Sequence, residues 1–262
     1  MSTAPGWEKW AEWNERQHRD VIAWFTAPLE ADMTLLDIAS GVGQPALAAA
    51  KRVKHVIATD VAADMLAGLE RRARAAGVTN IELRELDMHD LRGIPDASVD
   101  AVTLAFALMF SGQPATALRE AHRVLKPGGH FAVCVWDEPA RNPFFTTMFG
   151  AVRDVMQMPA PAPGAPGPFA LSEPGHLERL LREAGFAHID VTAKPFDFEF
   201  DSVDQHWEIN TALAAPLKRA AESLPPEQVR KLRDALAQAL APFMVGSRVR
   251  VPATPLCASA RT

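Results

Sequence analysis

The sequence predicts an α/β protein whose core is a doubly wound, mostly parallel sheet. Apolar segments of strand length alternate with amphipathic segments of helix length over residues 34–136. Two of the apolar segments, AVTLAFALMF at 101–110 and FAVCVW at 131–136, are apolar at nearly every position, as strands buried on both faces are. Strands and helices that alternate at this spacing form βαβ units, which place parallel strands side by side.

The first half of the chain gives the clearest pattern. Trp7, Trp10 and Trp13 are spaced by three in a polar segment, which predicts one or two amphipathic helices over residues 7–27. Apolar runs then predict strands, and Gly77 is a natural end for the second of the helices between them. The expected strands are 34–38, 55–60, 81–86, 99–107 and 130–136, and the expected helices are 45–51, 62–77 and 115–125.

The second half has a less regular pattern. Residues 156–175 hold six of the 21 prolines, which excludes a helix or a central strand there and predicts a loop. This loop is either a spacer or a semi-rigid flap over an active site. Regular structure should resume at Ser172, and we expect a helix over 172–184, a long strand over 188–200, helices over 216–241 and a final strand over 249–260.

Without an internal repeat or a clear linker, residues 1–262 are expected to form a single domain with helical additions. Its expected parts are an N-terminal helical cap at 1–30, a ligand-binding core at 31–140, a proline-rich loop at 141–175, and a C-terminal half of the sheet with inserted lid helices at 176–262.

Composition excludes several classes of protein. A net charge of −5 offers no basic surface for nucleic acid or an anionic membrane. The N-terminal segment has no apolar core of the signal-peptide type, and no apolar run approaches the length of a membrane span. The two cysteines, Cys134 and Cys257, are far apart in the sequence, so neither a disulfide framework nor a cysteine-rich metal site is expected. These features predict a cytoplasmic protein without a metal.

The segment LLDIASGVGQPALAAA, residues 35–50, suggests a ligand. Its GVGQPA part fits GxGxxA, a permitted form of the dinucleotide fingerprint, in which backbone amides approach a pyrophosphate. Asp37, however, precedes the loop by two residues, and no lysine or arginine occurs within residues 33–50. A carboxylate at this position would repel phosphate, whereas it suits a cationic ligand such as S-adenosylmethionine, which carries an ammonium and a sulfonium.

Two further observations bear on the choice of ligand. Asp60 ends the second strand 19 residues after Gly41, where a carboxylate can accept hydrogen bonds from both hydroxyls of a ribose; this supports an adenosine without identifying the rest of the ligand. The chain contains no tyrosine, which excludes short-chain dehydrogenases because they depend on a catalytic tyrosine. Other dehydrogenases stay open.

In five segments the chain resembles the class I S-adenosylmethionine-dependent methyltransferases, and within them the small-molecule branch that includes ubiquinone and menaquinone C-methylases. The resemblance is strong over residues 33–137 and loose elsewhere. It implies a Rossmann-like sheet of seven strands, mostly parallel with the last strand antiparallel, and helical lid additions. The matching segments are LLDIASGVGQ, VIATDVAADML, ELDMHDL, PDASVDAVTLAFALMF and HRVLKPGGHFAVCVW.

The resemblance also implies a set of residues that bind S-adenosylmethionine, from the methionyl part through the ribose and adenine to the sulfonium side. These are Asp37, Ala39, Ser40, Gly41, Gly43, Gln44, Asp60, Val61, Met65, Asp87, Met88 and Ala105. The family has glycine where Ala39 stands. We expect an ordinary backbone at Ala39, with a small side chain being sufficient, because alanine at positive φ would be strained.

The predicted function is methyl transfer to the carbon, oxygen or nitrogen of a small-molecule acceptor, by in-line displacement that depends mainly on alignment. His18 and His206 are the candidates for a general base, with His176 as a further histidine of the same kind. We expect neither nucleic acid nor a membrane as partner, and a homodimer stays open. The alternatives are an NAD(P)-dependent oxidoreductase that uses the GVGQPA loop, and a cofactor-binding module without catalysis.

Overall fold

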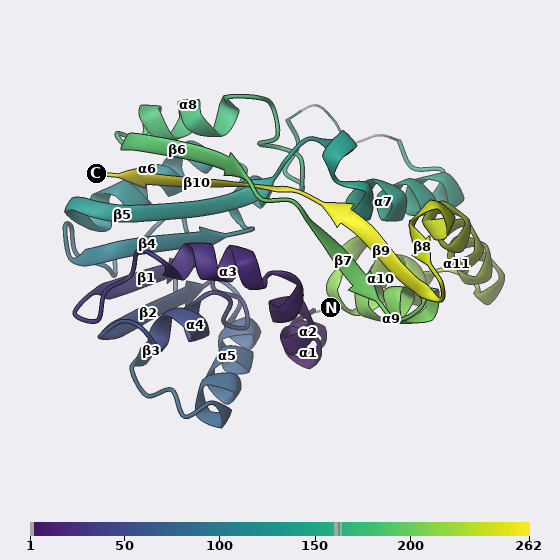
Figure 1. The fold of residues 1–262 in the computed structure, drawn as a ribbon, viewed down its shortest axis with the longest axis horizontal. Coiled ribbons are helices and arrows are strands. Elements are labelled where there is room, and N and C mark those ends of the chain that lie inside the picture. The colour runs from purple at the N-terminus through teal and green to yellow at the C-terminus, as the bar shows by residue number, and fades with distance from the viewer. Residues whose placement is uncertain (1–2, 160–161, 163) are drawn as a thin grey trace.

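A computed structural model describes residues 3–159, 162 and 164–262 of the chain (Figure 1). Within them, a seven-stranded sheet has the order β3-β2-β1-β4-β5-β10-β6, and β10 runs antiparallel to both of its neighbours while the remaining pairs are parallel. The predicted fold class is therefore confirmed. The strands are β1 Thr34–Ile38, β2 His55–Asp60, β3 Ile81–Glu85, β4 Val99–Ala105, β5 Leu125–Trp136, β6 Ala187–Ala193 and β10 Pro255–Arg261.

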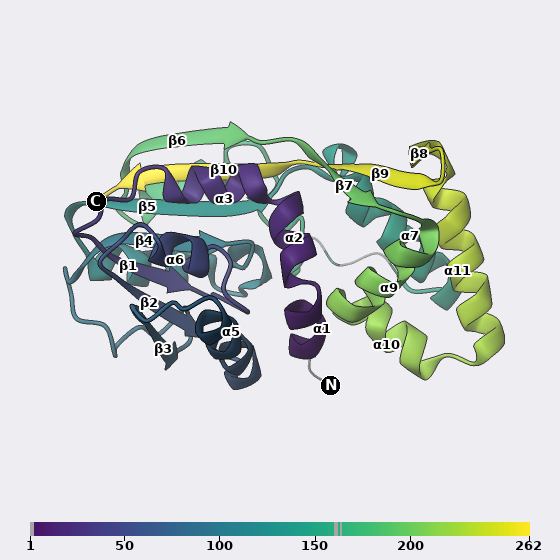
Figure 2. The same cartoon turned by 60° about the horizontal axis from the view of Figure 1, so that its bottom comes forward.

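Helices cover both faces of this sheet because its central strands are apolar on both sides. Leu35 of β1 belongs to an apolar cluster with α4 and α5, whereas Leu36, the next residue, points into the larger cluster that includes α6 and α8. Helix α3 lies across β5 and β10 (Figure 2). The bounds of these helices are α3 Arg19–Thr26, α4 Ala46–Ala50, α5 Ala63–Ala75, α6 Pro114–Val124 and α8 His176–Glu183.

A second, three-stranded sheet of order β7-β9-β8 extends from the large sheet and was not expected from the sequence (Figure 1). The predicted strands over 188–200 and 249–260 are each wrong as single strands, because each divides between the two sheets. The divisions fall at residues 194–195, which include Pro195, and at Thr254, directly before Pro255. A proline lacks the N–H that a continuous ladder uses, so Pro195 favours the first division. The strands of this sheet are β7 Phe196–Phe200, β8 Met244–Val245 and β9 Arg248–Ala253.

Four helices surround the small sheet, and one of them corrects an expectation. Helix α7, Pro143–Met156, occupies the first part of the segment expected to be a proline-rich loop. Pro143 takes the first helical turn, where its missing N–H costs nothing, and the next proline comes only at Pro159. Residues 160, 161 and 163 of the expected loop, like residues 1 and 2 of the expected cap, lie outside the described residues. The other helices here are α9 Val203–Leu213, α10 Ala215–Ser223 and α11 Pro226–Leu240.

The first two helices lie between the part of the molecule built on the large sheet and the part built on the small sheet, as both views show (Figures 1 and 2). Helix α1, Ala4–Lys9, contacts α5 and α9, and helix α2, Ala11–Gln17, contacts β7. Trp13 of α2 is buried, stacks on Phe198 and donates a 3.1 Å hydrogen bond from Nε1 to the carbonyl of Glu199. The tryptophan-bearing segment is thus helical, as predicted, but it divides into the three short helices α1, α2 and α3 rather than one or two. Single 3₁₀ turns occur at η1 Leu108–Phe110, η2 Pro139–Arg141 and η3 Ala241–Phe243.

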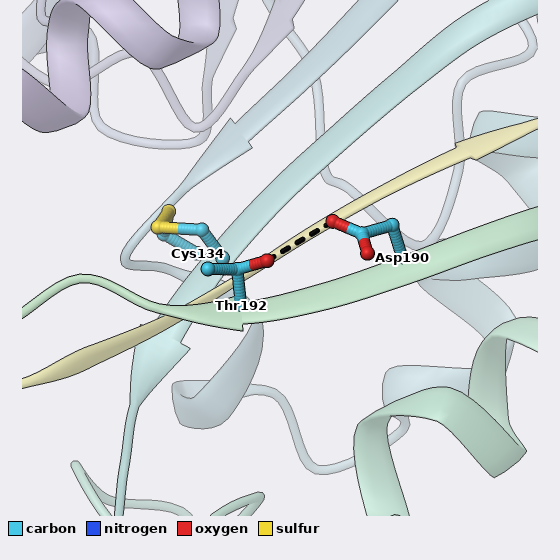
Figure 3. Close-up of a disulfide and its surroundings, with 4 residues drawn as sticks. Cys134, Asp190 and Thr192 are labelled. Carbon is cyan, nitrogen blue, oxygen red and sulfur yellow. Dashed lines mark hydrogen bonds between the residues drawn. A yellow bond between two sulfur atoms is a disulfide. The ribbon is translucent and has the colours of Figure 1, made fainter.

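Cys134 and Cys257 form a disulfide, which contradicts the expectation from their separation in the sequence (Figure 3). They are directly opposite residues on the antiparallel strands β5 and β10, with their Cα atoms 4.4 Å apart. Sequence distance was a poor guide because the chain returns to pair its last strand with β5. Among the described residues, no helix combines the length and the apolarity needed to cross a membrane.

Candidate functional site

Three carboxylates gather at the edge of the sheet where the parallel strands end. Asp37 lies near the end of β1, Asp60 is the last residue of β2, and Asp87 follows β3 by two residues. Since β1, β2 and β3 run parallel and pair as neighbours, the three side chains belong to one edge of the sheet. Open α/β sheets bind their ligands at this edge, so the structure brings together what the sequence predicted here.

Asp37 is fully buried, and only one of its carboxylate oxygens forms a hydrogen bond. The hydroxyl of Thr103, its register partner on β4, donates a 2.6 Å hydrogen bond to Oδ1. The hydroxyl of Ser40 donates instead to the backbone carbonyl of Asp37, at 2.8 Å. Oδ2 is buried without a partner, an arrangement that costs free energy unless a ligand supplies a donor.

Burial raises the pKa of the Asp37 carboxyl to about 7. The hydrogen bond from Thr103 opposes this rise, and the negative charge of Asp60 adds to it. The amide of Ala46 also lowers the pKa, although it lies outside hydrogen-bonding geometry. A carboxyl in this state ionises readily when a cation arrives, because the cation removes the penalty that burial imposes.

The loop after β1 has the backbone that a close approach of ligand requires. Gly41 has φ +54°, and a Cβ placed there would meet no atom within 4 Å, so open space lies beside it. Gly43 has φ +109°, and a Cβ there would come within 2.3 Å of Leu69. Ala39 has φ +54°, so the expectation of an ordinary backbone at this alanine is wrong. The loop demands the left-handed conformation there whichever residue occupies it.

Asp60 fixes this loop to the second strand. Its Oδ2 accepts a 2.9 Å hydrogen bond from the amide of Gly41, and its Oδ1 accepts one of 2.9 Å from the amide of Ala62. Each oxygen keeps a further lone pair for a ligand hydroxyl. Val61, next in the chain, is 58% exposed, and Met65 on the following turn is half-buried. This places an apolar surface beside the carboxylate.

Asp87 is exposed and is oriented by a histidine that the sequence analysis did not select. Its Oδ1 accepts hydrogen bonds from the amide of His89 at 2.9 Å and from His89 Nδ1 at 2.5 Å. Nε2 of His89 lies 2.6 Å from the hydroxyl of Ser111, which follows η1. These bonds hold the pKa of the Asp87 carboxyl below its usual range and engage only Oδ1. Met88 is partly buried against the core.

The N-terminal helices reach the loop through Gln44. The side-chain amide nitrogen (Nδ2) of Asn14 on α2 donates a 2.7 Å hydrogen bond to Oε1 of Gln44. One turn later, His18 is 5% exposed, and its Nδ1 lies 2.9 Å from the carbonyl of Asn14. Nδ1 must carry the proton to donate a hydrogen bond to that carbonyl, so in the neutral ring Nε2 carries the lone pair. Nε2 has no hydrogen-bond partner. Burial lowers the pKa of His18 to about 4, so its ring is neutral at pH 7.

Aromatic rings surround His18 at the ends of β4 and β5. Phe106 directly follows Ala105, the last residue of β4, and Trp136 ends β5. Sequence reasoning missed these rings as a group. The alternation in FDFEF, residues 196–200, was the available signal, because it places its three phenylalanines on one face of β7. The rings within 6.2 Å of the His18 ring, centroid to centroid, are Phe106, Trp136, Phe196 and Phe198.

His206 lies outside the group of aromatic rings that surrounds His18. It lies on α9, is fully buried, and has ring contacts with Phe144 and Phe200, neither of which contacts the ring of His18. Both of its ring nitrogens lack a partner, and burial lowers its pKa to about 4. His176 begins α8, which packs on α6 and β6. The two predicted base candidates therefore occupy different places.

The residues at this edge fit S-adenosylmethionine. The unpartnered, buried oxygen of Asp37 suits an ammonium, since a cation satisfies it both as a donor and as a charge. The open space beside Gly41 leaves room for a ligand that passes close to the backbone. Asp60 and Asp87 offer acceptors to hydroxyl and amine groups farther along the same edge. A pyrophosphate would instead meet buried negative charge.

Comparison with known proteins agrees with this geometry. Residues 36–133 match the model of a methyltransferase domain. The chain is 36% identical over 126 residues to a demethylmenaquinone methyltransferase of Clavibacter sepedonicus, covering 48% of this chain and 50% of that protein. The solved YcgJ protein of Bacillus subtilis has a TM-score of 0.63 at 18% identity, over 94% of this chain and 99% of that one. Phosphoethanolamine N-methyltransferase 2 of Haemonchus contortus, solved with S-adenosylhomocysteine, has a TM-score of 0.56 at 16% identity, over 94% and 52%.

Residues 36–133 are therefore similar to a methyltransferase domain. At these low identities the solved structures establish the fold alone. The chain spans about half the length of the curated relatives it matches.

Proposed function

We propose that the protein transfers a methyl group from S-adenosylmethionine to a small-molecule acceptor. The observation that carries this proposal is the buried Oδ2 of Asp37, which has no hydrogen-bond partner and lies at the ligand-binding edge of the sheet. An isolated carboxylate in such a place is costly unless a cation is its natural partner. The donor's ammonium meets that need, and the nicotinamide cofactors carry no comparable group on their pyrophosphate side.

Different residues of the chain would bind different parts of the cofactor. Asp37 and the loop 39–44 would hold the methionyl part, and Asp60 with Val61 and Met65 would hold the ribose and one face of the adenine. Asp87 and Met88 would border the adenine edge. Ala105, at the end of β4, would stand beside the sulfonium. These assignments follow the shared edge of the sheet and the resemblance in the loop and strand ends.

Methyl transfer requires mainly that side chains position the methyl donor and the methyl acceptor. A sulfonium supplies an already activated methyl group, and alignment of donor and acceptor can contribute about 7–11 kcal/mol toward the barrier. Buried aromatic walls around His18 would exclude water from the reacting atoms. The His18 ring is neutral at pH 7 and can accept a hydrogen bond, although it is a weak base. We assign it to orienting the methyl acceptor and to receiving a proton from that molecule where methylation releases one.

A small acceptor is supported by the surroundings of this edge. Apolar side chains of α2, of β7 and of the ends of β4 and β5 pack together in one cluster beside this edge. The net charge of −5 disfavours nucleic acid as the acceptor. The demethylmenaquinone methyltransferase named above is a small-molecule enzyme by its name, which agrees with this acceptor class.

Thermal unfolding with four ligands tests the proposal. We expect S-adenosylmethionine and S-adenosylhomocysteine to raise the melting temperature, because each would bind only the folded state. NAD⁺ and NADPH should leave it unchanged. Stabilisation by the nicotinamide cofactors alone would instead favour an oxidoreductase that uses the GVGQPA loop. A radiolabelled methyl donor incubated with a small-molecule extract would then reveal the acceptor.

A further inference from the structure

We propose that the protein has a second small-molecule site, separate from the cofactor edge, which binds a monocarboxylate whose apolar body is about the size of one six-membered ring. The site is a cavity of about 200 Å³ between helix α2 and the small sheet. None of the described residues that line this cavity belongs to the set assigned to S-adenosylmethionine. Binding at this cavity is therefore independent of the proposed function.

Aromatic side chains form the buried part of the cavity wall. Trp13 is 7% exposed and Phe200 is 1% exposed, and their ring centroids lie 4.9 Å apart. Trp10, where α1 meets α2, is the third aromatic residue in the lining. An apolar cavity of about 150 Å³ holds a benzene molecule. A cavity of about 200 Å³ therefore has room for one ring and a small substituent.

Two side chains of the lining leave their polar group without a hydrogen-bond partner among the described residues, and both groups are donors. Nε1 of Trp10 is buried and unpartnered. The guanidinium of Arg16 is exposed and takes part in no hydrogen bond or ion pair within the part of the chain that the structure describes. An indole N–H only donates, and a buried donor without an acceptor costs free energy. A ligand that supplies acceptor oxygens removes this cost.

The two carboxylates in the lining already have arginine partners. Oε1 of Glu199 lies 3.2 Å from Nε of Arg250. Oδ1 of Asp201 accepts a 3.3 Å hydrogen bond from Nη2 of Arg248. Among the described residues, Arg16 is therefore the one charged side chain of the lining that has no opposite charge beside it. The unbalanced charge at this cavity is positive, which favours an anionic ligand.

A carboxylate matches these donors better than a neutral or cationic group does. Its two oxygens only accept hydrogen bonds, whereas Nε1 of Trp10 and the guanidinium of Arg16 only donate them. A hydrogen bond from an arginine to a carboxylate is charge-assisted and stronger than one between neutral groups. A cation would leave both donors unpaired. The apolar body of the ligand would pack against Trp13 and Phe200, where burial of apolar surface adds to the affinity.

Benzoate, benzamide and benzylamine test the charge preference on the unmodified, full-length protein. They share one ring and carry an anionic, a neutral and a cationic group. By ligand-observed NMR, we expect benzoate to bind with a dissociation constant of about 1–10 mM, and at least about threefold more tightly than either of the others. A smaller preference, or no binding of benzoate below about 50 mM, would overturn the inference.

The indole N–H resonance of Trp10 reports whether benzoate occupies this cavity. In isotope-labelled protein, benzoate should shift this resonance, which is identified by its loss in Trp10→Phe. The resonance of Trp24, on α3 and outside the lining, should stay unchanged. The same shift should occur in the presence of S-adenosylhomocysteine. An unshifted Trp10 resonance, or displacement of benzoate by S-adenosylhomocysteine, would contradict a separate site.

Two pairs of variants assign the contacts. Arg16→Gln should abolish the preference for benzoate over benzamide, whereas Arg179→Gln should preserve it. Arg179 is the matched control because it is also exposed and has no ion pair among the described residues, but it lies on α8. Trp10→Phe should weaken benzoate binding about three- to tenfold, and Trp24→Phe should leave it unchanged. Retention of the preference in Arg16→Gln, or undiminished affinity in Trp10→Phe, would overturn the assignment.

The comparison of the three ligands on the unmodified protein does not depend on the folding of any variant. It also does not depend on the cofactor. If S-adenosylhomocysteine fails to bind while benzoate binds as described, the proposed function fails and the second site stands. If S-adenosylhomocysteine binds and the three ligands are not distinguished, the second site alone fails.

Discussion

Thr103 and Asp37 are register partners on neighbouring parallel strands, and the threonine hydroxyl donates a 2.6 Å hydrogen bond to one oxygen of the buried carboxyl. This contact fixes the orientation of the carboxyl, so that its other oxygen stays without a partner at the ligand edge. This unpartnered oxygen is the feature on which the proposed binding of a cationic ligand rests. The predictions below follow from this arrangement and from the other contacts at the site.

Cofactor binding should depend on pH through Asp37. In the free protein its carboxyl has a pKa of about 7, and a bound ammonium should lower that pKa because it favours the charged form. Binding therefore releases a proton below pH 7. The affinity for S-adenosylhomocysteine should be level above about pH 7.5 and fall by up to about tenfold per unit as the pH decreases below the free pKa. Calorimetry in buffers of different ionisation enthalpy would show the proton release; equal affinity at pH 5.5 and pH 8 would contradict it.

Ala39→Gly should stabilise the free protein. Alanine at φ +54° costs about 1–2 kcal/mol relative to the right-handed region, and glycine avoids this cost while losing about 0.5–1 kcal/mol of additional backbone entropy on folding. The free energy of unfolding in urea should rise by about 0.5–1 kcal/mol. Ala49→Gly, inside α4, is the control and should lower it by about 1 kcal/mol or more. A loss of stability in Ala39→Gly would argue against the left-handed backbone.

His89→Ala should weaken recognition of the adenine amine. The backbone amide and Nδ1 of His89 engage Oδ1 of Asp87, which leaves Oδ2 available to a ligand. We expect the affinity for S-adenosylhomocysteine to fall about three- to tenfold. The affinity for S-inosylhomocysteine, in which a carbonyl replaces the amine, should change much less. His55→Ala, which removes the partner of Glu82, serves as control and should alter neither affinity. An equal loss for both ligands would indicate a general structural effect.

Reduction of the Cys134–Cys257 disulfide should destabilise the fold. The bond closes a loop with a sequence separation of 123 residues and joins strands that are already paired. In urea, a reducing agent should lower the free energy of unfolding by about 2–4 kcal/mol. Cys257→Ala should be insensitive to the reducing agent. Thiol titration of the unreduced, unfolded protein should find no free thiol, and finding two would contradict the disulfide.

The sequence predicted the parallel part of the fold because its signals are local. The buried strands are continuously apolar, and Asp37, Asp60 and Asp87 each come at or just after a strand end, so their meeting at one edge follows from parallel pairing. The second sheet could not be predicted in the same way. The runs that divide at Pro195 and at Thr254 have the composition of single strands, and only the tertiary structure determines which sheet each half joins.

The contacts around the site were also beyond sequence reasoning. The Cys134–Cys257 pair and the rings around His18 depend on register between segments that are distant in the chain. The positive φ of Ala39 was misjudged because the preference of the residue was weighed above the demand of the loop. Local preference fails at such positions because the surrounding structure imposes the conformation.

The most direct test of the account is a calorimetric titration of S-adenosylhomocysteine at pH 8 into the unmodified protein and into Asp37→Asn. The substitution preserves the side-chain shape and the acceptor for Thr103 but removes the charge. The account predicts one binding site in the unmodified protein and an affinity about 10- to 100-fold lower in the variant, as expected for the loss of a charge-assisted hydrogen bond. Undiminished affinity in Asp37→Asn, or no binding to the unmodified protein, would contradict it.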